Sequence, residues 1–343
     1  MIKVLIVDDS SVMRRLIRQA LLQDDRLVVV GEANDPIEAR SAIKVHNPDV
    51  LLLDIEMPRM SGLEFLELLM RLRPMPVVMF SSLARSSREA TIRALSLGAV
   101  DCIEKPSADS GNTLERLADS LVVASQVDIN ALQRKSTISK RSNSFCWNGK
   151  PVLIGASTGG VDAIQSVLGT WPGNGPPTII TQHMPENFLR SFAQRLEDQM
   201  EMSVRVAKKQ DVVEQGEVVI CPGGPFHLEI TSVKPARVRL IEGPPVSGHR
   251  PSVDVMMRSA KAFGPRCVAA ILTGMGRDGA QGILDLRQNG AMTFGQDEGS
   301  SVVYGMPKVA FDLGGISQQL PIENIGEAIL DACSVKSRRQ VNA

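Results

Sequence analysis

The sequence predicts an α/β protein with two domains, each built around a mainly parallel sheet. Over residues 1–125, short apolar runs typical of strands alternate with apolar residues at helical spacing, and this alternation returns over residues 150–343. Between these two parts the pattern stops. Alternating strands and helices predict a parallel sheet with helices on both faces, and 343 residues are enough for two hydrophobic cores.

The first domain contains five apolar runs that predict strands. They are Ile2–Val7, Val28–Val30, Val50–Leu53, Val77–Phe80 and Val100–Ile103. Residues such as Leu63, Leu66 and Leu69 recur at helical spacing between them. In such a sheet the functional site lies beyond the carboxyl ends of the strands.

Polar residues stand at four of these strand ends. Asp8 and Asp9 follow the first strand, Asp54 the third, Ser81 the fourth and Lys105 the fifth. Three carboxylates at one sheet edge repel one another unless a hard cation lies among them, and Mg²⁺ prefers oxygen ligands. The alternative is that each aspartate caps the next helix and Lys105 is solvated, but four such ends favour a site.

These residues resemble the receiver domain of two-component response regulators, which has a flavodoxin-like (βα)5 fold. The matching segments are I-V-D-D-S at Ile6–Ser10, L-L-D-I-E-M-P at Leu52–Pro58, Ser61-Gly62-Leu63, Ser81 and Lys105-Pro106. The resemblance covers the whole first domain. It implies a phosphorylation switch.

The resemblance also implies a role for each matching residue. Asp54 would accept the phosphoryl group, and Mg²⁺ would be held by Asp9, Asp54, the Glu56 carbonyl and, through water, Asp8. Lys105 would neutralise phosphoryl charge and Ser81 would sense it. The family usually has a cis bond before the proline that matches Pro106. Cys102 departs from the pattern, because many receivers have an aromatic switch residue there.

Residues 126–149 are expected to form a flexible linker. The stretch from Lys135 to Ser144 is polar and basic and has almost no apolar residue that could pack. The predicted boundaries are therefore 1–125, 126–149 and 150–343.

The second domain begins with a strand, a glycine-rich turn and a helix. Pro151–Ile154 is apolar, and Gly155-Ala156-Ser157-Thr158-Gly159 has the G-x-S-x-G spacing of a nucleophile elbow. The helix N-terminus beyond it offers N–H groups and positive potential to an oxyanion. The alternative is that Ser157 is only a helix N-cap.

Two further strand ends carry residues that suit a hydrolytic site. His183 follows the predicted strand Thr178–Thr181, and Asp278 lies in the glycine-rich exit of Val268–Leu272. Each also has an ordinary interpretation, a structural histidine and an Asp-Gly turn. Together with Ser157 they could converge as a triad, whose order along the chain does not decide its chemistry.

A β-hairpin region is expected beside the doubly wound parallel sheet. Val218–Ile220 and His227–Ile230 read as two strands joined by a turn, and Val238–Ile241 as another. The polar segment His249–Asp254 is expected to open a helix near Val255–Met257.

With the receiver, these motifs resemble the chemotaxis protein-glutamate methylesterase family. The segments are the elbow, Gln182–Pro185, His249–Asp254, Thr273–Gly279, Gln296–Glu298 and Met306-Pro307. The resemblance implies hydrolysis of glutamyl methyl esters on chemotaxis receptors, with deamidation of receptor glutamines. A chemotaxis histidine kinase would donate the phosphoryl group, and the catalytic domain would need no cofactor.

The same resemblance implies the catalytic roles. Ser157 would be the nucleophile, His183 the general base and Asp278 the residue that orients the imidazole. Thr158 would support His183, and the Met275 N–H would help hold the oxyanion.

Composition excludes several other classes. Lys plus Arg and Asp plus Glu are both 38, so no basic face for nucleic acid is expected. No signal peptide or membrane-length apolar run is present, and five scattered cysteines suit reduced thiols, so a cytoplasmic protein without membrane insertion is expected. A DNA-binding response regulator is thereby disfavoured. A phosphorylation-controlled, non-catalytic binding module remains the alternative.

Overall fold

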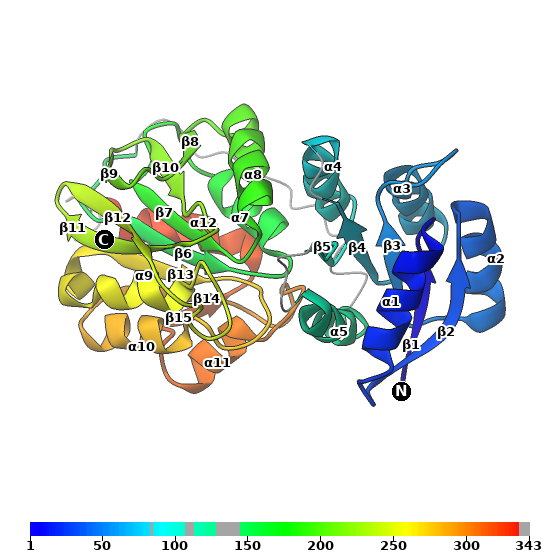
Figure 1. Cartoon of the computed structure of the whole chain (residues 1–343). Coiled ribbons are helices and arrows are strands. Elements are labelled where there is room, and N and C mark those ends of the chain that lie inside the picture. The colour runs from blue at the N-terminus through cyan, green and yellow to red at the C-terminus, as the bar shows by residue number, and fades with distance from the viewer. Residues whose placement is uncertain (83–84, 107–112, 128–144, 336–343) are drawn as a thin grey trace, which may run out of the picture. The chain divides into compact units, whose positions relative to one another are not determined.

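The computed structural model describes residues 1–82, 85–106, 113–127 and 145–335, and the chain divides into two compact units, Met1–Arg134 and Lys135–Ala343 (Figure 1). Residues 128–144 of the predicted linker lie outside the described residues. Each unit is described by itself.

The first unit is a five-stranded parallel sheet with the strand order β2-β1-β3-β4-β5. The strands are β1 (Ile2–Val7), β2 (Leu27–Ala33), β3 (Val50–Asp54), β4 (Val77–Ser81) and β5 (Asp101–Glu104). The helices are α1 (Ser11–Leu21), α2 (Pro36–His46), α3 (Gly62–Leu72), α4 (Arg85–Ser96) and α5 (Thr113–Ala124). The predicted (βα)5 fold is confirmed.

Local sequence explains where these elements begin and end. All five residues of β3 are buried, as expected for a central strand covered on both faces. Helix α3 begins with a capping box, in which Ser61 and Glu64 satisfy each other's backbone N–H groups. The cis bond expected before Pro106 is not found; the cis bonds of the described residues precede Pro235 and Pro251. The two isomers of an X–Pro bond differ by only about 0.5–1 kcal/mol, so local context decides between them.

The second unit contains a seven-stranded parallel sheet with the order β15-β14-β13-β6-β7-β10-β8. Its strands are β6 (Val152–Ala156), β7 (Thr178–Gln182), β8 (Ser203–Val206), β10 (Glu217–Ile220), β13 (Val268–Ile271), β14 (Met292–Gln296) and β15 (Gln318–Leu320). The surrounding helices are α7 (Gly160–Leu168), α8 (Glu186–Gln199), α9 (Val253–Ser259), η1 (Lys261–Arg266), α10 (Ala280–Gln288), α11 (Met306–Asp312) and α12 (Ile322–Ala332). Helix α7 packs against α12, and α9 packs against α10, so the sheet is covered on both faces.

A small antiparallel sheet with the order β11-β12-β9 lies beside the parallel one. It consists of β9 (Gln210–Val213), β11 (Phe226–Val233) and β12 (Ala236–Glu242). The predicted hairpin between Val218–Ile220 and His227–Ile230 is wrong, because β10 pairs in parallel with β7 and β8 while β11 pairs with β12. Gly223 and Gly224, both at positive φ, redirect the chain between the two sheets.

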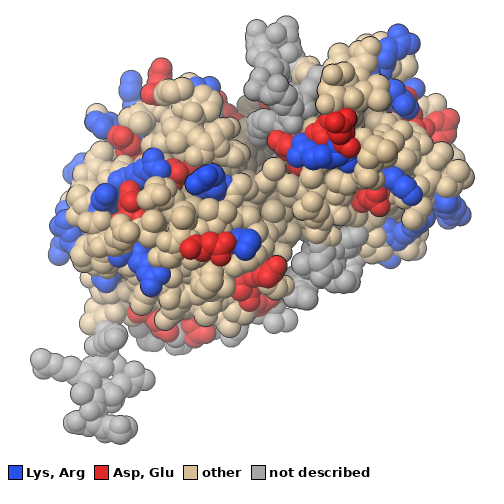
Figure 2. Space-filling view, turned by 90° about the horizontal axis from the view of Figure 1, so that it is seen from below, with Lys and Arg blue, Asp and Glu red and all other residues tan. Residues whose placement is uncertain are grey.

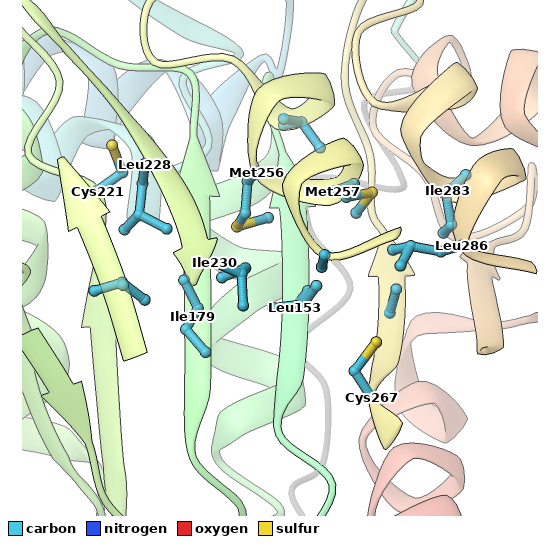
Figure 3. Packing of buried hydrophobic residues seen from close by; sticks show 14 of the residues in the cluster. Leu153, Ile179, Cys221, Leu228, Ile230, Met256, Met257, Cys267, Ile283 and Leu286 are labelled. Atoms are coloured by element: carbon cyan, nitrogen blue, oxygen red, sulfur yellow. The ribbon is translucent and has the colours of Figure 1, made fainter. Parts of the chain in front are cut away.

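The core of the second unit joins both sheets to the helices (Figure 3). Leu153 and Ile179 come from the parallel strands and Leu228 from β11, while Met256 and Ile283 come from α9 and α10. All of these side chains are buried. Burying one such side chain stabilises the fold by about 1.5–3 kcal/mol, so the small sheet and α9 are held firmly together.

The first described residues of the second unit are hydrogen-bonded to its last described residues. Trp147 pairs with Ser334 in a β-bridge, the Asn148 N–H donates to the Cys333 carbonyl at 2.8 Å, and Asn148 Nδ2 donates to the Ala332 carbonyl at 2.9 Å. These contacts close the domain just before β6.

On the face shown in Figure 2, acidic and basic side chains are interspersed on the described surface. None of the described helices combines the length and apolar composition that crossing a membrane requires.

Candidate active site

Ser157, His183 and Asp278 lie beyond the carboxyl ends of three neighbouring strands, β6, β7 and β13. Backbone hydrogen bonds hold these ends together: the Ser157 N–H donates to the Thr273 carbonyl and the His183 N–H to the Ala156 carbonyl, both at 3.0 Å. The fold therefore brings the three predicted residues to one edge of the sheet.

Glycines allow the turn that presents Ser157. Gly159 has φ 77°, a left-handed conformation that glycine adopts without strain. A side chain at Gly274 would place its Cβ 2.6 Å from the Ser157 Cβ, so only glycine permits this close approach. Gln182 Nε2 stabilises the turn by donating to the Ser157 carbonyl at 2.8 Å.

Two contacts restrain the imidazole ring of His183, a hydrogen bond at its edge and a stacked ring on its face. Its Nε2 lies 2.8 Å from Asp278 Oδ2, and because an ionised carboxylate can only accept, this nitrogen carries the proton. The ring of His249 is stacked on the ring of His183, with centroids 3.7 Å apart. The side chain of His183 is only 4% exposed.

Asp278 is completely buried, and its carboxylate has several donors. Oδ1 accepts from Ser252 Oγ at 2.8 Å and from the Asp254 N–H at 3.1 Å; Oδ2 accepts from the Val253 N–H at 2.7 Å and from His183. Burial by itself would raise the pKa of Asp278, but the hydrogen bonds from His183, Ser252 and Val253 outweigh burial and lower it. The carboxylate therefore stays ionised beside the imidazole.

The remaining predicted residues lie around Ser157. His183 Nδ1 is buried and has no hydrogen-bond partner among the described residues, so no such bond joins it to Ser157 Oγ. The N–H groups of Thr158 and Met275 donate no hydrogen bond within the described part of the chain. Among the described residues, the Thr158 side chain makes no hydrogen bond to His183; its carbonyl accepts from Thr273 Oγ1 at 2.9 Å.

A second site lies at the carboxyl edge of the receiver sheet. Lys105 Nζ is 2.8 Å from both Asp8 Oδ2 and Asp54 Oδ2, and both aspartates are 1% exposed. Burial raises the pKa of Asp54 to about 6, since it outweighs the opposing effect of Lys105. Burial by itself would lower the pKa of Lys105, but the contacts of its ammonium group with Asp54 and Asp8 outweigh burial and raise that pKa.

The receiver carries an acidic cluster typical of a magnesium site. Asp8, Asp9 and Asp54 each offer a carboxylate oxygen, and these oxygens lie within 4.8 Å of one another. Carboxylate oxygens are hard ligands that suit Mg²⁺, and the exposed Asp9 opens the cluster to solvent. The residues present therefore fit this ion.

Ser81 and Glu56 border this site. Ser81 is fully buried, and its Oγ donates to the Ser82 carbonyl at 3.2 Å and accepts from Thr91 Oγ1 at 3.5 Å. The Glu56 N–H donates to Asp54 Oδ1 at 3.2 Å, so the Glu56 backbone lies beside the carboxylate. Cys102, at the position where many receivers have an aromatic residue, is buried against Thr91, with Sγ 3.6 Å from its hydroxyl.

Sequence reasoning missed the roles of His249, Ser252 and Gln182, although it singled out the segments that contain them. The signal was the polar segment His249–Asp254 before a helix. What it could not show is that this segment lies against Asp278, which is 26 residues further along the chain than Ser252.

The chain is similar to known proteins over nearly its whole length. The family profile described as CheB methylesterase matches residues 152–329, and that of the response regulator receiver domain matches residues 4–117. The chain is 50% identical over 341 residues to the protein-glutamate methylesterase/protein-glutamine glutaminase 1 of Caulobacter vibrioides, covering 98% of this chain and 99% of that protein. It is 48% identical to the protein of Agrobacterium fabrum named protein-glutamate methylesterase/protein-glutamine glutaminase, covering 96% and 95%.

A solved structure agrees with the second unit. The crystal structure of the Thermotoga maritima CheB methylesterase catalytic domain superposes with a TM-score of 0.51 at 33% identity, covering 54% of this chain and 98% of that one. A receiver followed by a methylesterase domain, matched from end to end, leaves one conclusion: the chain belongs to the CheB family of protein-glutamate methylesterases/protein-glutamine glutaminases.

Proposed function

We propose that the second domain hydrolyses γ-glutamyl methyl esters on the cytoplasmic helices of chemotaxis receptors and deamidates receptor glutamines, under control of the receiver. The observation that carries this proposal is the 2.8 Å contact between His183 and the ionised Asp278 beside the Ser157 turn. Residues 1–125 would form the receiver, 126–149 the connection and 150–343 the catalytic domain. A cytoplasmic location follows from these partners.

In the proposed mechanism, Ser157 Oγ attacks the acyl carbon while His183 takes its proton. Because Asp278 occupies Nε2, the nitrogen that accepts this proton is Nδ1, and a small side-chain rotation in the substrate complex brings Ser157 Oγ to it. Asp278 stabilises the resulting imidazolium. His183 then gives the proton to the departing methoxide oxygen or amide nitrogen as its bond to the acyl carbon breaks, so that methanol or ammonia leaves. Water, activated by His183, then cleaves the acyl-enzyme and restores Ser157.

The oxyanion would be held by backbone N–H groups. The Met275 and Thr158 N–H groups make no other hydrogen bond within the described residues, and Thr158 directly follows the nucleophile, the position that supplies an oxyanion donor in nucleophile elbows. Losing one such donor typically costs about 2.7–4 kcal/mol of barrier. Support of His183 by Thr158 would require the Thr158 side chain to rotate toward the imidazole, since no hydrogen bond joins the two among the described residues.

In the receiver, Asp54 would accept the phosphoryl group from a chemotaxis histidine kinase. Asp9, Asp54, the Glu56 carbonyl and, through water, Asp8 would hold Mg²⁺, which when bound neutralises phosphoryl charge. Lys105, already beside Asp54, would pair with the phosphoryl oxygens. Ser81 would turn from the Ser82 carbonyl toward them, which alters the packing against Thr91.

A methanol-release assay on receptor-bearing membranes with labelled methyl esters tests the function. The wild-type protein is expected to release methanol, and Ser157→Ala to lose activity on the order of 10⁶-fold while Asp54 is still phosphorylated. Substantial methanol release by a folded Ser157→Ala protein would exclude Ser157 as the nucleophile. A wild-type protein that binds receptors without turnover would instead support a non-catalytic binding module.

A further inference from the structure

Ser252 lies where the small sheet, helix α9 and the Asp278 loop meet, and it is fully buried. Its hydroxyl donates to Asp278 Oδ1 at 2.8 Å and accepts from the Val255 N–H at 3.4 Å as the N-cap of α9. Its backbone N–H donates to His227 Nδ1 at 3.1 Å. The residue thus links Asp278 to a histidine of the antiparallel sheet.

The four donors around Asp278 fill the acceptor positions of a carboxylate. Without the Ser252 hydroxyl, Oδ1 would keep only the Asp254 N–H at 3.1 Å. The carboxylate could then rotate about its Cβ–Cγ bond. Oδ2 would keep the Val253 N–H at 2.7 Å, but because Oδ2 is also the atom that contacts His183, a less restrained carboxylate would hold the imidazole less firmly.

His227 in turn fixes the position of Ser252. The histidine is 2% exposed, and its Nε2 lies 2.9 Å from the Pro244 carbonyl. Since Nδ1 accepts from Ser252, the proton of this neutral ring is on Nε2, which donates to Pro244. Both ring nitrogens are therefore used, and the ring has one orientation that satisfies them.

We propose that Ser252 is a positioning residue for Asp278, and that His227 positions Ser252 from the antiparallel sheet. The proposal rests on the proposed function, in which His183 is the general base. Ser252 acts through Asp278 and neither touches substrate nor loses its own proton. The small antiparallel sheet would then help to hold Asp278 in position through His227 and Ser252.

Ser252→Ala and Ser252→Gly test this role, because both remove the hydroxyl and glycine is nearly as good as serine at an N-cap. Ser259→Ala is the matched control: this serine, at the other end of α9, donates to the Met256 carbonyl at 2.6 Å and accepts from the Ile230 N–H of β11 at 2.8 Å. It also joins α9 to the small sheet, but it is not among the hydrogen-bond donors of Asp278. Both Ser252 variants are expected to lose about 10- to 100-fold in kcat with little change in KM, as for the loss of one hydrogen bond to a charged group. The control is expected to stay within about twofold of wild type.

The pH profile separates positioning from a merely structural role. With one donor fewer, the negative charge of Asp278 is less stabilised, so protons bind more tightly to the His183–Asp278 pair. The acidic limb of kcat/KM is therefore expected to move to higher pH in Ser252→Ala and to stay in place in Ser259→Ala. A fall in activity without this movement, or activity within about twofold of the control, would overturn the proposal.

His227 provides a second, independent pair of variants. His227→Asn keeps an acceptor near the position of Nδ1, whereas His227→Phe removes it. The asparagine variant is expected to retain more activity, by about 5- to 10-fold, than the phenylalanine variant. Equal activities would show that His227 does not act through Ser252.

A readout without turnover distinguishes this proposal from the proposed function. The Nε2-bound proton of His183, hydrogen-bonded to Asp278 at 2.8 Å, is expected to give a downfield proton resonance in NMR. This resonance is expected to shift upfield or broaden in Ser252→Ala and to be unchanged in Ser259→Ala. If the wild-type protein releases no methanol but the resonance changes in Ser252→Ala and not in Ser259→Ala, the proposed function fails and the positioning role stands. If the resonance is unchanged in Ser252→Ala, the positioning role is overturned.

Discussion

The imidazole rings of His183 and His249 lie face to face, with centroids 3.7 Å apart and ring planes inclined by 4°. Asp278 restrains the same His183 ring at its edge. The hydrogen bond therefore restrains rotation of the ring within its plane, and the stacking restrains tilting of the ring out of that plane. The stacked ring of His249 therefore lies directly against the imidazole that takes up the proton in the proposed mechanism.

His249→Ala is expected to lower kcat by about 2- to 10-fold, because an aromatic pair contributes about 0.5–1.5 kcal/mol beyond the area it buries. His249→Phe keeps a flat ring against His183 and should retain most of the activity. Steady-state methanol release measures both variants. Equal losses in the two would show that the stacked ring is not what matters.

Asp54→Asn is expected to stabilise the receiver at neutral pH. The folded pKa of Asp54, about 6, lies above its ordinary value of 3.8, so protonation favours the folded state. Above pH 6 the charged Asp54 carboxylate therefore lowers the free energy of unfolding of the receiver. Replacing it with a neutral amide is expected to raise that free energy by about 3 kcal/mol. As the pH falls toward 4 the wild-type carboxyl becomes protonated, and the gain should shrink to below about 1 kcal/mol.

Calorimetric unfolding of the full chain in EDTA at pH 7.5 and pH 4 measures this difference. The receiver transition should rise in Asp54→Asn at pH 7.5 and nearly coincide with that of wild type at pH 4. A gain of equal size at both pH values would contradict the raised pKa.

Adding Mg²⁺ is expected to raise the melting temperature of the receiver transition, because an ion that binds only the folded state stabilises it, by about 2.7 kcal/mol at a hundredfold excess over Kd. Asp9→Asn removes one oxygen ligand of the acidic cluster and should abolish most of this rise. Asp25→Asn, an exposed carboxylate outside the cluster, is the control and should keep it. Equal responses of both variants would place the ion elsewhere.

The sequence predicted which residues meet at the carboxyl edge of the second sheet, because the signals were local. Ser157, His183 and Asp278 each follow an apolar strand, and parallel strands bring their carboxyl ends together without further information. The same reasoning predicted that Asp8, Asp54 and Lys105 lie at one edge of the receiver sheet, where Lys105 contacts both aspartates.

Strand pairing was less predictable because it is not local. Val218–Ile220 is a short apolar run whose pattern fits either sheet, and only its contacts with β7 and β8 decide. The strands β8, β9, β14 and β15 were missed, since three of them have only three or four residues and β14, with five, contains a glycine. The contact between Ser252 and Asp278 depends on how α9 packs over the parallel sheet, which no spacing along the chain reveals.

The last prediction concerns control of the esterase by the receiver. A fragment that begins at Phe145 keeps the contacts of Asn148 with the end of α12 and contains the whole core of the second unit, so it should fold alone. It is expected to release methanol faster than the unphosphorylated full chain, because a tethered receiver has an effective concentration near the millimolar range and can oppose substrate binding.

The size of this effect is limited by the free energy that phosphorylation supplies. Moving a population from 1:99 to 99:1 requires about 5.5 kcal/mol, whereas typical coupling energies are about 1–3 kcal/mol, so a gain of about 5- to 150-fold is expected. A small-molecule phosphodonor with Mg²⁺ should activate the full chain and leave the fragment unchanged, and Asp54→Asn should abolish the response of the full chain. A fragment no faster than the unphosphorylated full chain would mean that the receiver activates the enzyme positively, for example by docking it to receptors. A response of the fragment itself to the phosphodonor would mean that the signal does not pass through Asp54.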